Sequence, residues 1–248
     1  MDFSIRRIKT ALFELQNLIF RKLVAIQFLS KNKSRMLFLG NQYSGYWFPR
    51  NLVESAGTIW GVGLGHDSSF ELALVKLKFQ FVGFEPELTC FTNSVKQFAG
   101  TSAKIENYGL WDKPGTFSYT GENISIVDIF KLGNYSEEKL EIKSLWDVAS
   151  EKDLNSTPRP RVLKMNIEGA EKEILLKFIA EPLPFDVIIF QAEFLFHVGF
   201  MRFKEKWQAY KDLKLILIGM TALGWVVTDI SRHQFTLSSL NVDSSSIA

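Results

Sequence analysis

The chain has 248 residues, 46% of them hydrophobic and 14% aromatic, which is enough to bury one large core and excludes the composition of a disordered chain. The single cysteine, Cys90, excludes an intrachain disulfide and, with only three histidines, a Cys/His zinc cluster of the usual spacing. Residues 1–35 hold eight basic and two acidic residues, whereas the rest holds 21 basic and 25 acidic ones. The single cysteine indicates a reducing compartment, and we expect a cytoplasmic protein. Because the excess positive charge lies in an N-terminal arm and not on the body, we expect no binding of nucleic acid.

The arm has the pattern of an amphipathic helix over residues 4–29. Its polar residue Glu14 argues against a signal peptide, and Arg21 and Lys22 keep the apolar run too short to span a membrane. Two interpretations stay open: the helix packs on the body, or it makes peripheral contact with the inner, anionic face of a membrane. The apolar stripe consists of Ile8, Leu12, Leu15, Ile19, Leu23 and Ile26.

An aromatic segment, "SGYWFPRNLVESAG", is expected to lead irregularly from the arm to the body. We place the boundary after residue 50, with the arm and this lead-in at 1–50 and the main domain at 51–248. From Thr58 onward the pattern alternates between short apolar strands and helices. Strands are expected at 58–62, 81–85, 104–107, 161–167, 186–194, 225–229 and 234–240, and helices at 68–78, 89–98, 144–152, 169–179 and 201–223.

This alternation predicts an α/β fold with a mainly parallel sheet and helices on both faces. Residues 112–143 read as an insertion with strand-like pieces at 115–119 and 124–130. In such sheets ligands bind beyond the carboxyl ends of the strands. The loops that follow the strands are therefore where functional residues are expected.

A glycine-rich stretch, "GVGLGHDSSFE" at 61–71, joins the first strand of the body to the first helix. The dinucleotide pattern G-x-G-x-x-G fails here, because the sixth position is His66 in one frame and Ser68 in the other. This failure disfavours a nicotinamide dehydrogenase. The pattern G-x-G-x-G is present, and it suits a nucleoside with a charged amino-acid tail; the alternative is only a tight turn.

Glu85 ends the second strand of the body, 22 residues after Gly63. A carboxylate at that place can accept hydrogen bonds from both hydroxyls of an adenosine ribose. The alternative is a helix N-cap or a surface carboxylate.

The stretch "VLKMNIEGAEKEIL", residues 162–175, carries polar residues where a buried strand turns into a helix. Side chains in a strand alternate between its faces. If the strand runs that far, Lys164, Asn166 and Glu168 share one face, and Leu163, Met165 and Ile167 share the other.

Together, "GLGHDSSFE", "FVGFEPE", "NYGLWDKPGTFSY", "SLWDV", "VLKMNIEGAEKEIL" and "IIFQAEFLFH" resemble the FkbM-type family of S-adenosylmethionine-dependent methyltransferases, in order and spacing, over about residues 58–240. The most specific piece is "LKMNIEGAE", because the family shows a K-[IM]-D-[IV]-E-G-A-E run. The resemblance implies a Rossmann-like class I methyltransferase fold, with seven strands and the last antiparallel. It also implies O-methylation of a sugar, a glycolipid or a secondary metabolite.

The resemblance also implies places for the cofactor. Gly63, Gly65 and Asp67 would line its loop, and Glu85 would hold the ribose. The segment "GLW", which comprises Gly109, Leu110 and Trp111, would approach the adenine. No metal site is predicted.

One position departs from the family: Asn166 stands where the family has Asp. An amide can hold the cofactor's amino group or the acceptor by hydrogen bonds, but it cannot take a proton. Either another residue does the proton chemistry, or activity is weakened or lost.

The candidates for proton chemistry are Glu168, then Glu193 at the end of the fifth strand and His197 four residues later. Lys164 and Asn166 complete the candidate catalytic set. Three of these candidates have a structural alternative: Glu168, like Glu171, can favour the positive end of the following helix, Lys164 can form an ion pair, and His197 can be a solvated loop residue.

The sequence thus predicts a methyltransferase that uses S-adenosylmethionine on a small-molecule or glycan acceptor. The second hypothesis is a catalytically silent protein with the same fold, acting as a scaffold or cofactor-sensing subunit in a membrane-associated glycan pathway. Asn166 and the basic arm motivate it.

Overall fold

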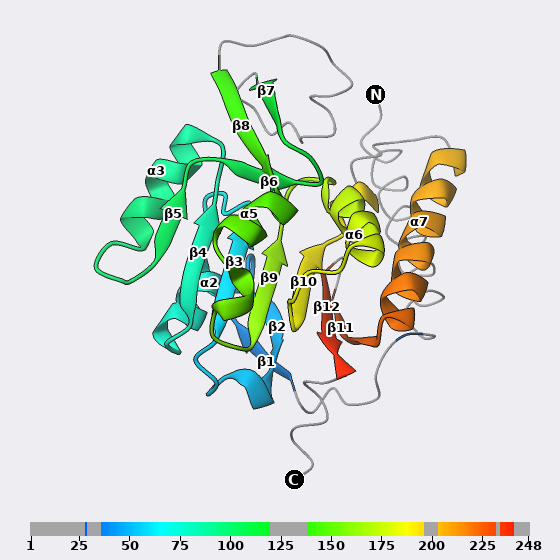
Figure 1. Cartoon of the computed structure of the whole chain (residues 1–248), viewed down its shortest axis with the longest axis horizontal. Helices are drawn as coiled ribbons and strands as arrows, with labels where there is room; N and C mark the ends of the chain where they lie inside the picture. The colour runs from blue at the N-terminus through cyan, green and yellow to red at the C-terminus, as the bar shows by residue number, and fades with distance from the viewer. Residues whose placement is uncertain (1–27, 29–35, 120–137, 196–202, 232–233, 241–248) are drawn as a thin grey trace, which may run out of the picture.

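A seven-stranded sheet forms the centre of the protein in a computed structural model, which describes residues 28, 36–119, 138–195, 203–231 and 234–240 (Figure 1). Neighbouring strands pair in parallel from β5 to β10, whereas β12 runs antiparallel to both β10 and β11. The expected mainly parallel sheet with an antiparallel last strand is confirmed. Across the sheet the order is β11 (Trp225–Ser231), β12 (Gln234–Ser239), β10 (Val187–Gln191), β9 (Arg161–Met165), β3 (Thr58–Val62), β4 (Gln80–Phe84) and β5 (Lys104–Glu106).

Helices cover both faces of this sheet, as the sequence predicts, and each face has its own hydrophobic cluster. The larger cluster contains Leu163 and Met165 of β9 and is covered by α5, α6 and α7. The smaller one contains Val162 of the same strand and is covered by α2 and by the residue after α3, Phe98. The helices span Ser69–Lys76 (α2), Leu88–Gln97 (α3), Leu145–Glu151 (α5), Glu171–Ala180 (α6) and Phe203–Ala222 (α7), and short 3-10 turns span Arg50–Leu52, Leu154–Ser156 and Glu193–Leu195.

A second, three-stranded sheet lies at one end of the molecule, where the sequence predicts an insertion (Figure 1). Its strands are β6 (Gly109–Trp111), β8 (Glu138–Ser144) and β7 (Gly115–Tyr119). The predicted strand at 115–119 is confirmed, and the one at 124–130 lies outside the described residues. The sequence analysis missed β8, although Leu140 and Ile142 are buried and alternate with charged residues, as in a half-buried strand.

Residues 36–49 form a β-hairpin of β1 (Met36–Leu39) and β2 (Tyr46–Pro49), where the sequence analysis expected an irregular lead-in. Tyr46 and Phe48 belong to the smaller core cluster, and the Thr236 hydroxyl on β12 donates to the Trp47 carbonyl at 2.8 Å. The hairpin is therefore packed on the main sheet, and its core residues precede the boundary placed after residue 50. A run of adjacent aromatics gives no alternation by which such a strand could be recognised.

The predicted amphipathic helix over residues 4–29 lies outside the described residues, apart from Phe28, which packs on the larger core cluster. Within the described part of the chain, no helix combines the length and the apolar character that crossing a membrane requires.

Candidate functional site

The turn between β3 and α2 contains two glycines in left-handed conformations, Gly63 with φ +72° and Gly65 with φ +57°. A Cβ atom on Gly63 would overlap the backbone carbonyl oxygen of Asn166, whereas one on Gly65 would meet nothing within 4 Å. Gly63 is thus required for close packing of two neighbouring turns, and Gly65 only for its backbone conformation.

Glu85, the residue after β4, accepts hydrogen bonds from the backbone of this glycine turn. Its Oε2 atom accepts hydrogen bonds from the backbone N–H of Leu64 at 2.8 Å and of Gly65 at 2.9 Å. Its Oε1 atom accepts from the N–H of Glu87 at 3.1 Å. The side chain is buried, and burial raises its pKa despite these hydrogen bonds. A carboxylate offers about four acceptor positions, so one remains for a ligand.

Asp67 lies at the end of the turn and connects it to the β1–β2 hairpin. Its Oδ2 atom accepts from Asn41 Nδ2 at 2.5 Å, and its Oδ1 atom accepts from the Ser69 N–H at 2.9 Å. Partial burial works against ionisation, but hydrogen bonds from Asn41 and Ser69 outweigh it and lower the pKa of Asp67. The predicted loop carboxylate is therefore ionised and is held in place by the hairpin.

The turn between β9 and α6 lies directly beside the glycine turn, because β3 and β9 are paired. Strand β9 ends at Met165, and the Asn166 N–H then donates to the Val62 carbonyl at 3.0 Å. Glu168 (φ +55°) and Gly169 (φ +100°) both adopt left-handed conformations. The expectation that strand alternation extends to Glu168 is wrong, because the backbone turns before it, and the Glu168 side chain is exposed.

Glu171 holds this second turn from within helix α6. Its carboxylate accepts from the N–H of Ile167 at 2.7 Å and from that of Gly169 at 2.9 Å. The side chain is fully buried, and burial raises its pKa to about 8. The sequence analysis gave Glu171 only a favourable place at a helix start. The spacing of four residues from Ile167 is the one signal that could have indicated its bonds.

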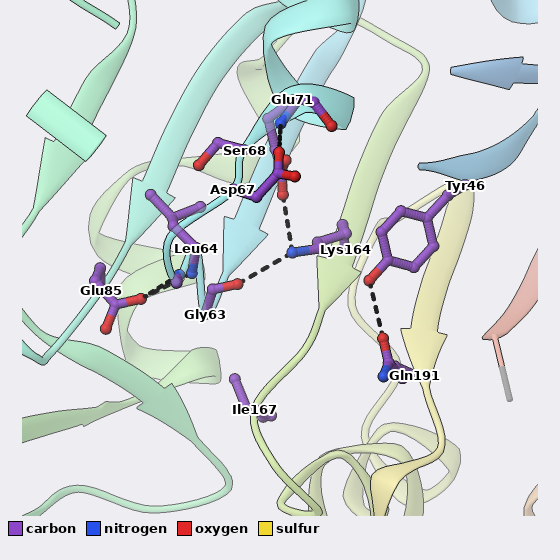
Figure 2. A network of polar contacts seen from close by, with 12 residues as sticks. Tyr46, Gly63, Leu64, Asp67, Ser68, Glu71, Glu85, Lys164, Ile167 and Gln191 are labelled. Carbon is purple, nitrogen blue, oxygen red and sulfur yellow. Dashed lines mark hydrogen bonds and ion pairs between the residues drawn. The ribbon is translucent and has the colours of Figure 1, made fainter. Parts of the chain in front are cut away.

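Lys164 and Glu71 form a buried ion pair between β9 and α2, with Lys164 Nζ 2.9 Å from Glu71 Oε1 (Figure 2). The two residues are 3% and 1% exposed, so solvent screens their attraction little. Lys164 Nζ also donates to the Gly63 carbonyl at 3.0 Å and lies 5.6 Å from the centre of the Tyr46 ring. Lys164, a predicted catalytic candidate, thus forms the ion pair that the sequence offered as its structural alternative. Its partner Glu71 was not predicted.

Glu193 follows β10 at the same edge of the sheet, in the 3-10 turn Glu193–Leu195. Its carboxylate accepts a hydrogen bond from the Gln191 side-chain amide. The Tyr46 hydroxyl in turn donates to the side-chain oxygen Oε1 of Gln191 at 3.4 Å (Figure 2). Burial raises the pKa of Tyr46 to about 12 and so keeps this hydroxyl protonated. His197, the remaining catalytic candidate, lies outside the described residues.

The "GLW" segment forms β6, which pairs in parallel with β8. Leu110 and Trp111 are buried in the larger core cluster. A Cβ atom on Gly109 would lie 3.2 Å from Pro86, next to Glu85. The segment is thus close to the end of β4, and its approach to an adenine stays a prediction.

The carboxyl edge of the sheet therefore brings together the turns after β3 and β9, Glu85 after β4 and Glu193 after β10. The Asn166 Oδ1 atom is buried here and has no hydrogen-bond partner among the described residues. Within the same residues, no group of three or more His, Cys, Asp or Glu side chains could hold a metal ion.

No protein-family model matches the chain, and a search of curated proteins finds no match.

Proposed function

We propose that the protein is an S-adenosylmethionine-dependent methyltransferase that methylates a hydroxyl group of a sugar, a glycolipid or a secondary metabolite. The proposal combines the FkbM-type resemblance of the motifs with the positions of these motifs in the fold. The sheet order, with one antiparallel strand between β10 and β11, is compatible with the Rossmann-like class I methyltransferase fold that the resemblance implies.

The observation that carries the proposal is that the backbone N–H groups of the glycine turn already donate hydrogen bonds to a side chain of the protein. A dinucleotide pyrophosphate would bind free backbone N–H groups at such a turn. Here the N–H groups of Leu64 and Gly65 already donate to Glu85. A pyrophosphate would have to displace a buried carboxylate of the same charge sign. The turn therefore disfavours a nicotinamide dinucleotide.

The charges at this edge favour a ligand with positive groups. Carboxylates follow β3, β4, β9 and β10, and the positive charge of Lys164 is paired with Glu71. S-adenosylmethionine carries a positive sulfonium and an ammonium group. The residues that supply the acidic character are Asp67, Glu85, Glu168 and Glu193. Glu171 is not counted, because burial raises its pKa to about 8.

The described residues fit the polar groups of this cofactor. The remaining acceptor position on Glu85 suits a ribose hydroxyl, and the Asn166 Oδ1 atom suits the ammonium group. Burying a carbonyl oxygen without a partner is unfavourable, so a donor that reaches Asn166 gains the corresponding free energy. When bound, the cofactor supplies an electrophilic methyl group on a sulfonium.

The chain's own task is to align an acceptor hydroxyl with the methyl group and to remove the hydroxyl proton. Among the described candidates, Glu168 and Glu193 have carboxylates that can accept a proton. Lys164 is excluded from this role by its ion pair with Glu71, and Asn166 by its chemistry. Glu168 is the first candidate for the base because its side chain is exposed beside Asn166.

A comparison of ligands tests the proposal. We expect S-adenosylmethionine and S-adenosylhomocysteine to bind to the wild-type protein and NAD not to bind. Tight NAD binding without binding of S-adenosylmethionine would contradict the proposal and support a dehydrogenase.

The silent scaffold is the second candidate, and one observation favours it: two of the five candidate catalytic residues cannot accept the hydroxyl proton, Lys164 because it is already charged in its pair with Glu71, and Asn166 because it is an amide. The variant Asn166→Asp separates the two functions. A large rise from near-zero methyl transfer would favour the silent protein, whereas turnover by the wild type would exclude it.

A further inference from the structure

The peptide unit between Gly63 and Leu64 is held at both ends by buried, oppositely charged side chains. Its carbonyl oxygen accepts from Lys164 Nζ at 3.0 Å, and its N–H donates to Glu85 Oε2 at 2.8 Å. Figure 2 shows Lys164 and Glu85 on opposite sides of the turn, each directed toward this peptide. In a trans peptide the C=O and N–H point in opposite directions, so both bonds can form only in one orientation of the peptide plane.

Reversing this peptide plane would be unfavourable at both ends. The carbonyl oxygen would then face the Glu85 carboxylate, and the N–H would face the Lys164 ammonium group. Gly63 tolerates the change in ψ that this reversal requires, because glycine adopts many backbone conformations that other residues do not. The reversal would also drive Leu64 toward a positive φ, which a residue with a Cβ atom disfavours. The two buried side chains add to this preference for one orientation of the peptide.

Glu71 allows Lys164 to carry its charge in the core. Burial lowers the pKa of a lysine, but the adjacent Glu71 carboxylate outweighs burial and raises the pKa of Lys164 above its ordinary value. Tyr46 adds a ring 5.6 Å from Lys164 Nζ on the side of the hairpin.

Stability alone does not account for such a pair. A buried ion pair loses solvation, and replacing it with apolar residues of similar size is often neutral or stabilising. In some proteins a buried polar or charged group instead selects one conformation.

We infer that Lys164, charged through its pair with Glu71, is a positioning residue that works with Glu85 to fix the Gly63–Leu64 peptide and so pre-forms the ligand-binding turn. The inference rests on the proposed function only for the identity of the ligand. The two hydrogen bonds that Lys164 and Glu85 make to this peptide, which we call the clamp, are a property of the ligand-free protein.

The first test measures hydrogen exchange at single backbone amides in the ligand-free protein, for the wild type and the double variant Lys164→Met/Glu71→Met. This variant removes both charges, so neither is left buried alone. We expect the amides of Leu64 and Gly65 to exchange about ten- to hundredfold faster, as for the loss of a charge-assisted hydrogen bond. The Gly63 amide, which donates to the Phe84 carbonyl at 3.0 Å, should keep its wild-type rate.

The matched control is Lys172→Met, which removes a lysine paired with Asp212 at 3.1 Å between α6 and α7. It should leave exchange at Leu64 and Gly65 unchanged. Wild-type exchange at these two amides in the folded double variant would overturn the inference. If the apolar variant does not fold, Lys164→Gln/Glu71→Gln, which keeps size and polarity without charge, decides by the same criterion.

A second readout separates this inference from the proposed function. In the double variant we expect weaker binding of S-adenosylhomocysteine and an unchanged melting temperature. If the pair were merely structural, its removal would lower the affinity and the melting temperature together, or would leave both unchanged. If the wild type does not bind S-adenosylhomocysteine, the proposed function fails, and the exchange comparison still tests the clamp.

Discussion

Gly63 lies so close to Asn166 that a Cβ atom on Gly63 would overlap the Asn166 carbonyl oxygen. The contact joins the turns after β3 and β9, which contain the two left-handed glycines Gly63 and Gly65 and the "NIEGAE" run. It predicts different effects for the two left-handed glycines. Gly65→Ala should lower the free energy of unfolding by about 1–2 kcal/mol, the cost of a left-handed conformation for a residue with a Cβ atom.

Gly63→Ala should lower the free energy of unfolding clearly more than Gly65→Ala, because a steric overlap with backbone adds to the conformational cost. Denaturant unfolding of both variants measures the difference. Equal losses would show that the two turns separate without penalty, and would contradict the close packing.

The raised pKa of Glu171 predicts a specific pH dependence of the free energy of unfolding. Its pKa is raised to about 8 in the folded protein from an ordinary value of 4.5, so the folded state holds a proton that the unfolded state has released between these values. The contribution of Glu171 to stability is therefore fully present below about pH 4.5 and is lost as the pH rises toward about 8.

The variant Glu171→Gln cannot ionise, so its stability should decline less than that of the wild type between these pH values. Urea unfolding at a series of pH values measures both curves, and their difference isolates Glu171 from other titrating groups. Parallel curves would mean that the pKa of Glu171 is the same in the folded and unfolded states.

The loop-to-hairpin contact can be tested through Asn41. Its side chain donates to Asp67 at 2.5 Å and accepts from the N–H groups of Tyr43 and Ser44 at 2.7 and 3.0 Å. Asn41→Ala should lower the free energy of unfolding by about 0.5–1.5 kcal/mol, the net contribution of a typical hydrogen bond, because these bonds are exposed to solvent. The pKa of Asp67 should also rise toward its ordinary value, measured by carbon NMR of its carboxylate. An unchanged pKa would show that Asn41 does not stabilise the ionised form.

The basic arm predicts salt-dependent membrane contact. If residues 4–29 form an interfacial helix, the protein should sediment with vesicles that contain anionic lipids at low salt, and less so at high salt. The charge reversal Arg21→Glu/Lys22→Glu should weaken this binding, and neutral vesicles provide the control. Full-length protein that ignores anionic vesicles at low salt would exclude membrane contact and leave packing on the body.

Much of the fold could be predicted because its signals are local. The apolar runs of β9 and β10 and the helical spacing after β3 lie within single segments, and parallel pairing follows from their alternation. The β1–β2 hairpin, which contains Tyr46, was missed because its adjacent aromatic residues do not alternate with polar ones. Strand β8, which contains Leu140, was missed because it lies in a segment without a clear boundary.

The candidate site was predicted at the level of segments and only partly at the level of side chains. Alternation placed Lys164 on a face of its strand, but its partner Glu71 is 93 residues away in the sequence, and only tertiary structure joins them. Glu85 stands at a predicted position, but its bonds to the N–H groups of Leu64 and Gly65 join segments about 20 residues apart, so only tertiary structure reveals them. The bonds of Glu171 to Ile167 and Gly169 are local, and its spacing from Ile167 was the signal for them.

We propose that the edge formed by the turns after β3 and β9 binds S-adenosylmethionine. Calorimetric titration of the wild type, Asn166→Ala and the remote surface variant Gln208→Ala with S-adenosylhomocysteine tests it most directly. We predict binding by the wild type and by Gln208→Ala, and an affinity loss of about 1–3 kcal/mol for Asn166→Ala, the usual effect of removing one buried hydrogen-bond partner. Absence of binding by the folded wild-type protein would contradict the proposal and leave the α/β fold without an assigned ligand.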